Sequence, residues 1–318
     1  MVSEDIDEFL RNKNLETDVV NLIKILTQCT EAVADILART PVHHVGTSNV
    51  FGDAQLSVDV QSDKTIFEIL SQSGLVSHAA SEEQPELRPL SPAGKFTVCF
   101  DPLDGSSIVD CNWAVGSIFG VWKAGPVLGR SGRDQVLAAV AVYGPRTSLI
   151  MATGETVFEL SRIAENRWII TNEFARKIAE NAKIFSPANL RSSQDLPGYA
   201  AVIDEWMTKR LTLRYTGGMV PDVASILIKG NGIFASPVSS KAPAKLRLVF
   251  ECAPIAYIVE AAGGRALSGR NTSECVLDVV IESMDDRVGI VCGSKREVEK
   301  TVESIVENQG ERVMRSGA

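Results

Sequence analysis

Apolar residues recur at helical spacing in the first part of the chain. Between Asp18 and Ala38 they lie three or four positions apart, which is typical of an amphipathic helix, at Val19, Leu22, Ile23, Leu26, Val33, Ile36 and Leu37. Pro41 ends this pattern. A second helical pattern follows Asp53, with its inner side at Leu56, Val60, Ile66, Ile69 and Leu70. We therefore predict two helices ahead of the first strand.

Short runs of β-branched, aromatic and other apolar residues dominate the next hundred positions. The uncharged segment Phe96–Cys99 predicts a buried strand, and further strands are expected at 114–122, 136–143, 148–152 and 156–160. Gly-Pro pairs at 125–126 and 144–145 separate several of these runs as turns, which favours a mostly antiparallel or mixed sheet. The segment between Ile169 and Ile184 is predicted to be helical or irregular.

The second half of the chain returns to helical patterns after a change of composition. Residues 185–198 are rich in serine and proline, and we expect a domain boundary there, with domains at 1–185 and 186–318. Helices are predicted over Asp222–Lys229 and Pro254–Ala262, and a strand over Gly289–Cys292.

Composition and charge narrow the function classes. The 318 residues are 45% hydrophobic and 23% charged, and the net charge of −8 argues against nucleic acid or an anionic membrane as a partner. No apolar run is long enough to span a bilayer, and the acidic start is unlike a targeting peptide, so we expect a cytoplasmic protein. The six cysteines form no CxxC pair, which favours neither a disulfide framework nor a zinc site.

The chemistry centres on the segment FDPLDGSS, residues 100–107. Asp101 and Asp104 flank a proline that restricts the backbone, so we expect both carboxylates and the Leu103 carbonyl to crowd into one volume and the strand to end there. Such oxygens suit a hard cation. Backbone N–H groups of the turn formed by Gly105, Ser106 and Ser107 could hold an anion beside it. The alternative is an acidic surface turn.

Other carboxylates at the edges of apolar segments extend this set. They are Asp59, the adjacent pair Glu82 and Glu83, and Glu251. Asp53 fits either this group or a helix N-cap. Two carboxylates about 4 Å apart repel by roughly 4 kcal/mol at an effective dielectric of 20, so such a cluster calls for divalent cations such as magnesium. Basic residues of the second half would bind the rest of a polyanionic substrate, and a sugar with two phosphates fits this division.

Three segments together resemble the fructose-bisphosphatase family of metal-dependent sugar phosphatases. They are FDPLDGSS, Ser81-Glu82-Glu83 upstream, and KLRLVFE at 245–251. Further segments at 49–59, 189–191 and 213–223 also match. All of these segments occur in the same order as in the family, and the resemblance extends from about Leu22 to Cys292. The resemblance implies an α/β (α+β) fold, a layered αβαβα sandwich in which two sub-domains each hold a mixed sheet flanked by helices.

The resemblance also implies the activity and the site. Magnesium, as two or three ions per site with manganese able to substitute, would promote hydrolysis of the 1-phosphate of a sugar bisphosphate by an activated water. The implied metal ligands are Glu82, Glu83, Asp101, Asp104, Glu251 and the Leu103 carbonyl. The implied catalytic residues are Asp59, Glu83 and Asp53. Gly105, Ser106 and Ser107 correspond to the turn around the departing phosphate.

The remaining matched positions concern the far end of the substrate. Contacts with the sugar or its distal phosphate are implied for Arg191, Arg214, Tyr215, Lys245 and Arg247. In the family the equivalent of Arg214 can reach the neighbouring subunit's site, so a homodimer or homotetramer is expected.

Two departures from the family pattern bear on the substrate. Ser236 stands where fructose-bisphosphatases usually carry a tyrosine, and Gly218 replaces the serine of their Gly-Ser-Met. Both favour sedoheptulose 1,7-bisphosphate over fructose 1,6-bisphosphate. The alternatives are fructose-1,6-bisphosphatase or dual activity, an inositol-phosphate phosphatase, and a non-catalytic sugar-phosphate sensor. A sensor would lack a catalytic carboxylate, and none is missing.

Overall fold

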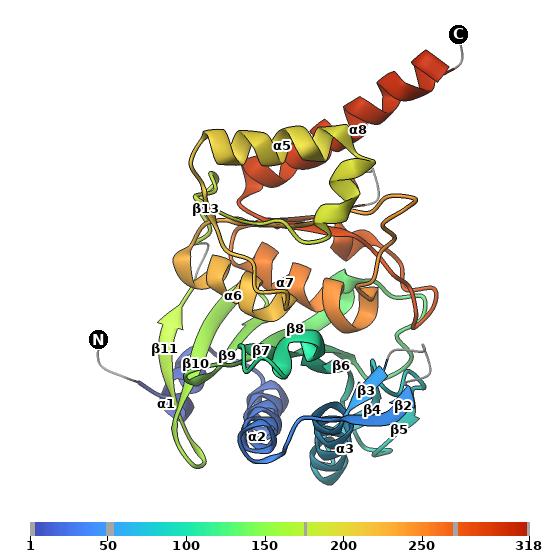
Figure 1. The fold of residues 1–318 in the computed structure, drawn as a ribbon. Helices are drawn as coiled ribbons and strands as arrows, with labels where there is room; N and C mark the ends of the chain where they lie inside the picture. Colours follow the sequence, from blue (N-terminus) through green and yellow to red (C-terminus); the bar gives the residue numbers. More distant parts are fainter. Residues whose placement is uncertain (1–3, 49–53, 175–176, 270–272, 317–318) are drawn as a thin grey trace.

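Helices and sheets alternate in layers through the molecule. The structure is a computed structural model that describes residues 4–48, 54–174, 177–269 and 273–316. From bottom to top in Figure 1, a helical layer, a large sheet, a second helical layer, a smaller sheet and a third helical layer follow one another. This arrangement confirms the αβαβα sandwich that the resemblance implied.

The larger sheet contains nine strands in the described part of the chain. Neighbouring strands are antiparallel except for the parallel pair β4 and β6. The order across the sheet is β1 (Glu4–Asp5), β11 (Arg167–Glu173), β10 (Thr156–Ala164), β9 (Thr147–Thr153), β8 (Gln135–Tyr143), β7 (Val115–Lys123), β6 (Phe96–Asp104), β4 (Val76–Ser81) and β5 (Arg88–Pro89).

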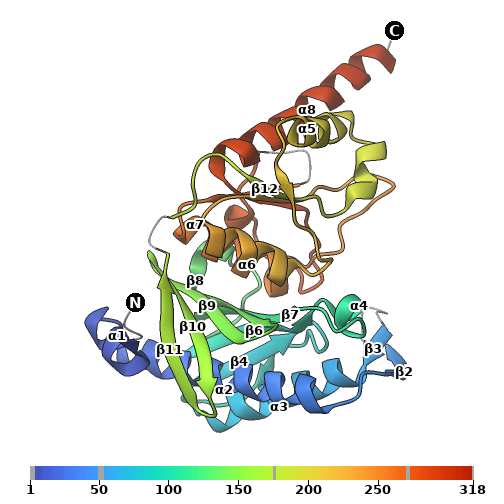
Figure 2. The ribbon, with the colours of Figure 1, turned by 60° about the vertical axis from the view of Figure 1, so that its left-hand side comes forward.

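Two long helices cover the outer face of this sheet. They are α2 (Thr17–Arg39) and α3 (Ser57–Gln72), which lie side by side beneath it in Figure 2. Both were predicted from the apolar spacing, and the predicted apolar positions of α2 are buried except Leu37, which is partly buried. Val60 of α3, predicted on the inner side, is instead exposed. The short helix α1 (Ile6–Asn12) precedes them, and the small ribbon of β2 (His44–Ser48) and β3 (Ala54–Leu56) connects them.

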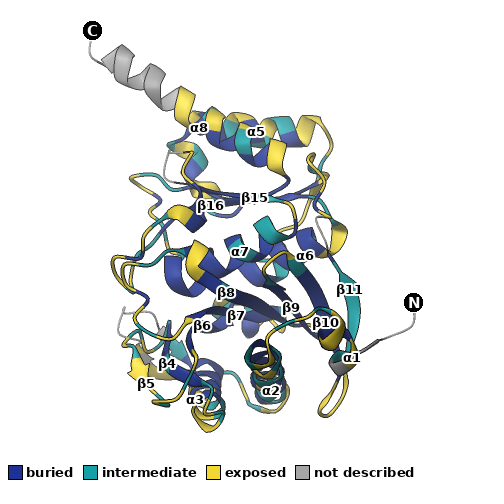
Figure 3. Ribbon diagram, turned by 180° about the vertical axis from the view of Figure 1, so that it is seen from behind, coloured by how far each residue is buried: buried dark blue, intermediate teal, exposed yellow. Residues whose placement is uncertain are grey.

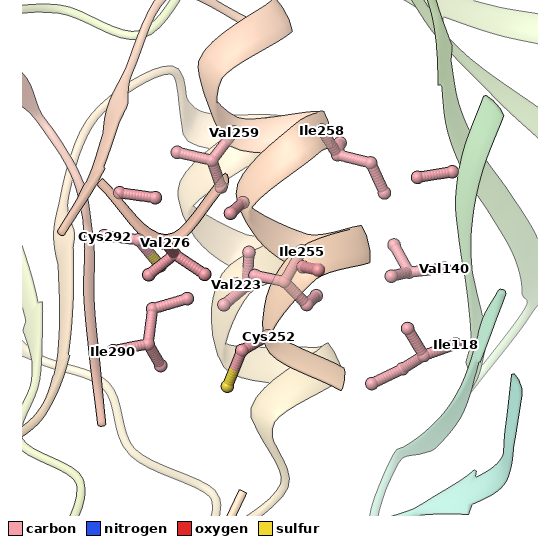
Figure 4. Packing of buried hydrophobic residues seen from close by; sticks show 14 of the residues in the cluster. Ile118, Val140, Val223, Cys252, Ile255, Ile258, Val259, Val276, Ile290 and Cys292 are labelled. Carbon is pink, nitrogen blue, oxygen red and sulfur yellow. The ribbon is translucent and has the colours of Figure 1, made fainter. Parts of the chain in front are cut away.

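The middle layer consists of α6 (Met219–Lys229) and α7 (Ala253–Ala261), the two helices predicted in the second half. Figure 4 shows Ile255 and Ile258 of α7 facing Ile118 and Val140 of the larger sheet, with Cys292 of the smaller sheet on the opposite side. One continuous apolar core therefore joins the two sheets. In Figure 3 much of the ribbon in this region is dark blue, with teal and yellow segments on α6 and α7.

The smaller sheet has five strands among the described residues. Their order is β13 (Thr212–Leu213), β12 (Ile184–Ser186), β14 (Ile233–Ser236), β16 (Ile290–Gly293) and β15 (Arg265–Ser268). The outer face is covered by α5 (Pro197–Thr208) and α8 (Lys295–Ser316), and Tyr199 and Trp206 of α5 are fully buried in that layer. The expected domain boundary at residue 185 falls within β12.

Short turns complete the fold at α4 (Ser106–Val109), η1 (Gly132–Asp134), η2 (Leu190–Gln194), η3 (Leu248–Cys252) and η4 (Val276–Asp278). Within the four described ranges, no helix combines the length and the apolar character needed to cross a membrane.

Two predictions about strands were wrong. The strand at Phe96 does not stop at Pro102 but continues to Asp104, because a bulge accommodates the proline: Asp101 pairs with Ile118 and Asp104 with Gly116, so β6 has one more residue than β7 there. The segment after Ile169 begins as strand and not as helix or irregular chain. Its residues up to Glu173 belong to β11, which pairs with β10 and β1 and is rich in β-branched side chains. Residues 177–183 are irregular, as predicted.

Candidate functional site

Two parallel strands end at the same edge of the larger sheet and bring carboxylates into one region. Ser81 at the end of β4 pairs with Phe100 of β6, and the Glu82 backbone N–H donates to the Phe100 carbonyl at 3.0 Å. Glu82 and Glu83 therefore follow β4 directly beside Asp101, which lies in the last part of β6.

Three buried carboxylates converge at this edge. Asp101, Asp104 and Glu251 each offer an oxygen, and these oxygens lie within 4.8 Å of one another. Glu251 comes from η3, a turn that contacts both β6 and β7. The three residues are nearly inaccessible to solvent. Carboxylate oxygens gathered at this spacing can bind a divalent cation.

Backbone donors orient each of the three carboxylates. The Leu103 N–H donates to Asp101 Oδ1 at 2.8 Å, and the Arg247 N–H donates to Glu251 Oε2 at 2.5 Å. Asp104 accepts two hydrogen bonds from the first turn of α6, at 3.2 Å from Met219 and 2.6 Å from Val220. The free N–H groups of a helix N-terminus thereby hold this carboxylate in place.

Burial and mutual repulsion make this cluster unfavourable when it is fully ionised. Burial, then the charges of Glu82 and other neighbouring carboxylates, raises the pKa of Asp101 and that of Glu251 well above their ordinary values. Burial raises the pKa of Asp104 to about 6, although its hydrogen bonds with Val220 and Met219 oppose the change. A bound divalent cation would remove this penalty, because it stabilises the ionised forms.

Asp59 adds a fourth buried acidic group, on the first turn of α3. Its Oδ2 accepts a hydrogen bond from the Leu56 N–H at 3.0 Å, and its Oδ1 is buried with no hydrogen-bond partner among the described residues. Burial, followed by the charges of Glu83 and Glu82, raises the pKa of Asp59 to about 7. A carboxylate with this pKa can take a proton near neutral pH. Asp53 lies outside the described residues.

The turn after β6 carries Gly105, Ser106 and Ser107, the residues expected to surround the departing phosphate. Gly105 has φ of +96°, a left-handed conformation that favours glycine, and Ser106 starts the single turn α4. Ser106 is half-buried and Ser107 is exposed. Ser107 also lines the adjacent pocket.

A pocket of about 290 Å³ extends from Asp104 toward the smaller sheet. Four of the predicted substrate-binding residues line it: Ser107, Arg191, Tyr215 and Lys245. Ser236, the residue that departs from the family pattern, lines it as well. Positive charge and hydrogen-bonding groups thus face the same hollow as Asp104, as a phosphorylated sugar would require.

The structure does not bring Arg214 and Arg247 to this pocket. Arg214 directly follows β13, and its side chain is exposed to solvent. Arg247 is buried with the carboxylates, where its guanidinium pairs with Glu82 and lies 3.6 Å from an oxygen of Asp285. The sequence expectation that Arg247 contacts the sugar therefore differs from its position here, where its guanidinium pairs with an acidic residue of the site instead of lining the pocket.

Sequence reasoning missed the polar groups that hold the site together. The N–H groups of Met219 and Val220 that orient Asp104 are backbone atoms, which leave no residue-type signal. Asp222, also on α6, is buried, and its Oδ1 accepts a hydrogen bond from the Thr216 N–H at 2.9 Å. Burial raises its pKa to about 7. The sequence signal that could have identified Asp222 is its position as an acidic residue among the apolar residues at the start of a predicted helix.

Comparison with known proteins gives consistent matches over nearly the whole chain. The family model "Fructose-1-6-bisphosphatase, N-terminal domain" matches residues 4–173, and "Fructose-1-6-bisphosphatase, C-terminal domain" matches residues 178–306. The curated "Sedoheptulose-1,7-bisphosphatase, chloroplastic" of Spinacia oleracea is 39% identical over 308 residues, which cover 95% of this chain and 78% of that protein. "Fructose-1,6-bisphosphatase class 1" of Pelobacter propionicus is 37% identical over 302 residues, covering 94% and 92%.

Solved structures agree with these sequence matches. The 1.85 Å crystal structure of "Putative Sedoheptulose-1,7 bisphosphatase from Toxoplasma gondii" has a TM-score of 0.89 and 40% identity, and covers 96% of this chain and 99% of that chain. The fructose-1,6-bisphosphatase of Leishmania major in its holo form has a TM-score of 0.86 and 27% identity, with the same coverage. The resemblance seen in the sequence is confirmed: the chain belongs to the fructose-1,6-bisphosphatase family.

Proposed function

We propose that the protein hydrolyses the 1-phosphate of sedoheptulose 1,7-bisphosphate in a magnesium-dependent reaction, giving sedoheptulose 7-phosphate and phosphate. The observation that carries this proposal is the position of Asp104. It lies both in the buried carboxylate cluster and on the wall of the pocket that Arg191 and Lys245 line. A phosphate bound at the cluster would therefore keep the rest of the sugar in the basic pocket.

The residues at the cluster fit magnesium. Asp101, Asp104 and Glu251 supply carboxylate oxygens in a buried site with raised pKa values, and Glu82, Glu83 and the Leu103 carbonyl would complete the set of oxygen donors for two or three ions. When bound, magnesium supplies charge neutralisation for the phosphate and makes water a better nucleophile. Manganese also prefers oxygen ligands and could substitute.

The protein's own groups then have separate tasks. Asp59, with its partner Glu83, would accept the proton of the attacking water, since burial brings its pKa near neutrality. The N–H groups of the turn after Gly105 would hold the departing phosphate. Arg191, Tyr215 and Lys245 would orient the sugar and its distal phosphate.

Steady-state kinetics with both bisphosphates test the proposal. We expect phosphate release that requires magnesium, and a higher kcat/KM for sedoheptulose 1,7-bisphosphate than for fructose 1,6-bisphosphate. No release of phosphate from either substrate would favour the sugar-phosphate sensor. A strong preference for the six-carbon substrate would favour fructose-1,6-bisphosphatase, an alternative supported by the comparable identity to class 1 fructose-1,6-bisphosphatases. The proposal includes a cytoplasmic location, and a fluorescent fusion would distinguish this from the plastid of the chloroplastic relatives.

A homodimer or homotetramer is also part of the proposal. Arg214 is exposed and lies outside the pocket of its own chain, as expected for a residue that reaches the neighbouring subunit. Mixing inactive Asp101→Asn subunits with Arg214→Ala subunits tests this arrangement. Hybrid oligomers should regain a low KM at the intact metal site if Arg214 acts across the interface. No recovery after confirmed exchange of subunits would mean that Arg214 acts within its own chain or not at all.

A further inference from the structure

Glu82 and Glu83 occupy the two central positions of a tight four-residue turn. The Ser81 N–H donates to the Gln84 carbonyl at 3.0 Å, and the Gln84 N–H donates to the Ser81 carbonyl at 3.2 Å. The Ser81 hydroxyl also accepts from the Gln84 N–H, at 2.9 Å. The two residues at the ends of this turn therefore hold the backbone that presents both glutamates.

A buried carboxylate on α3 holds the far end of the turn. Asp63 is 3% exposed and accepts a hydrogen bond from the side-chain amide of Gln84. Burial raises the pKa of the Asp63 carboxyl, and its hydrogen bond with Gln84 opposes the change. Asp63 thus anchors the Gln84 end of the turn that presents Glu82 and Glu83.

A second contact joins the turn to the same helix. The other side-chain atom of Gln84, Oε1, accepts from Arg88 Nη1 at 3.0 Å. The Arg88 guanidinium lies 4.7 Å from the centre of the Phe67 ring, and Phe67 is one helical turn beyond Asp63 on α3. Gln84 is therefore held between two points on one helix face.

We propose that Asp63 and Gln84 are positioning residues that fix Glu82 and Glu83 relative to Asp59. This inference rests on the proposed function, because it concerns the metal ligands and the proton acceptor of that reaction. Asp59 and Asp63 are one turn apart on α3, so the helix that carries the proton acceptor also anchors the turn that carries the two glutamates. Partners of this kind, which orient ligands without contacting the metal, commonly change metal affinity by roughly 10- to 100-fold.

The donor and the acceptor of the hydrogen bond between Gln84 and Asp63 can be interchanged by a double substitution, as well as removed by single ones. In Asp63→Asn with Gln84→Glu, the donor and acceptor swap sides, while the carboxylate introduced at position 84 can still accept from Arg88. Asp63→Ala and Gln84→Ala delete the contact. Glu31 on α2 is the matched control, since it is also a buried carboxylate and is held by the Asn166 N–H at 2.8 Å and by Arg162.

Binding of Mn²⁺ alone, measured by calorimetry on the full chain, is the primary readout, together with Tm in chelator. We expect Asp63→Ala and Gln84→Ala each to weaken Mn²⁺ binding by roughly 10- to 100-fold. The exchanged pair should bind within about threefold of wild type, whereas Glu31→Gln should lower Tm with unchanged Mn²⁺ binding. In kinetics the deletions should raise the magnesium concentration needed for half-maximal rate and leave the KM for the sugar bisphosphate unchanged.

Two results would overturn the inference. One is Mn²⁺ binding by Asp63→Ala that is weakened no more than in Glu31→Gln. The other is an exchanged pair that folds with the wild-type Tm and binds Mn²⁺ as weakly as the deletions. Failure of the proposed function would look different, because wild-type protein would then bind Mn²⁺ normally without releasing phosphate from either bisphosphate.

Discussion

At the residue scale, Asp101 allows the metal role to be separated from the fold. Its Oδ1 already accepts the Leu103 N–H, so an asparagine keeps that hydrogen bond and loses only the charge. We expect Asp101→Asn to lower magnesium-dependent phosphate release by roughly 1,000-fold, since a lost metal ligand removes several kcal/mol of transition-state stabilisation. Without metal the variant should be more stable than wild type by roughly 1–3 kcal/mol, because a repelling charge is gone.

The matched control for this change is Asp204→Asn, an exposed aspartate on α5 that should alter neither property. Activity close to wild type in Asp101→Asn would refute the role of the carboxylate cluster. Asp104 is a poorer choice for this experiment. Both its oxygens accept backbone N–H groups, so an amide there would oppose one of them with its own donor.

The second prediction at this scale concerns substrate size. Ser236 is small and lines the pocket beside Phe234, so Ser236→Tyr would fill space that a longer sugar needs. We expect kcat/KM for sedoheptulose 1,7-bisphosphate to fall by roughly 10- to 100-fold relative to that for fructose 1,6-bisphosphate, in line with the roughly 1–3 kcal/mol that pocket contacts contribute to discrimination. Ser236→Ala is the control, and an unchanged ratio in the tyrosine variant would remove Ser236 from the specificity argument.

Residue types revealed the acidic side of the site better than its basic side. Asp101, Asp104 and Glu251 were predicted to gather, and their oxygens do. The signal was the place of each acidic residue at the edge of an apolar segment. Arg247 was assigned to the sugar, but its side chain turns inward to Glu82. A long cation can reach several anions, and sequence does not tell which one it contacts.

At the element scale, the junction of β7 and α6 sets the position of Asp104. Gly116 of β7 pairs with Asp104 across the sheet, and a Cβ at Gly116 would lie 2.3 Å from Cγ1 of Val220 and 2.6 Å from the Ala141 carbonyl oxygen. Glycine at 116 thus lets the start of α6 approach closely enough for its N–H groups to reach Asp104.

We therefore expect Gly116→Ala to act on both stability and the metal site. Overpacking should cost roughly 1–3 kcal/mol, seen as a lower denaturation midpoint. Displacement of Val220 should also raise the magnesium concentration that gives half-maximal activity. Gly144→Ala provides the control, because the nearest atom to its added Cβ is 3.5 Å away. Equal behaviour of the two variants would contradict this account of α6.

Periodicity predicted most helices and strands but not how each strand ends. The spacing of apolar residues located α2, α3, α6 and α7 to within a few residues. It failed at β11, where helical and strand patterns both fit a short mixed segment, and only pairing with β10 decides between them. It also failed at Pro102, because whether a bulge forms depends on the partner strand.

At the scale of the whole molecule, the site joins the two halves of the sandwich. Asp101 and Asp104 belong to the larger sheet. Glu251 and the N–H donors of Met219 and Val220 belong to the helical layer between the sheets, and Ser236 belongs to the smaller sheet. The carboxylate cluster therefore lies between the two sheets, and when its members are ionised their mutual repulsion opposes the packing of one sheet against the other. Metal binding should stabilise the entire fold and not only the local loops.

The pH dependence of stability tests this connection. In the metal-free protein, the pKa values of Asp104, Asp59 and Asp222 are raised to about 6, about 7 and about 7, above the ordinary value near 4 of an unfolded chain. Between about pH 4 and 7 the folded state consequently binds more protons than the unfolded state. The free energy of unfolding should fall as pH rises through this window, by roughly 1.4 kcal/mol per pH unit for each proton of difference.

Magnesium should reverse the trend, because it binds the ionised carboxylates that repel one another in its absence. We expect denaturant unfolding in chelator to show stability decreasing from about pH 5 to pH 7, and the gain in stability on adding magnesium to increase over the same range. Asp101→Asn should reduce the slope in chelator and shrink the magnesium gain together, since the pKa of Asp101 is itself raised by burial and its carboxylate belongs to the cluster that would bind the metal. The part of the slope that comes from Asp59 and Asp222 should remain. Stability in chelator that rises over this range would contradict the raised pKa values of these buried carboxylates in the folded protein.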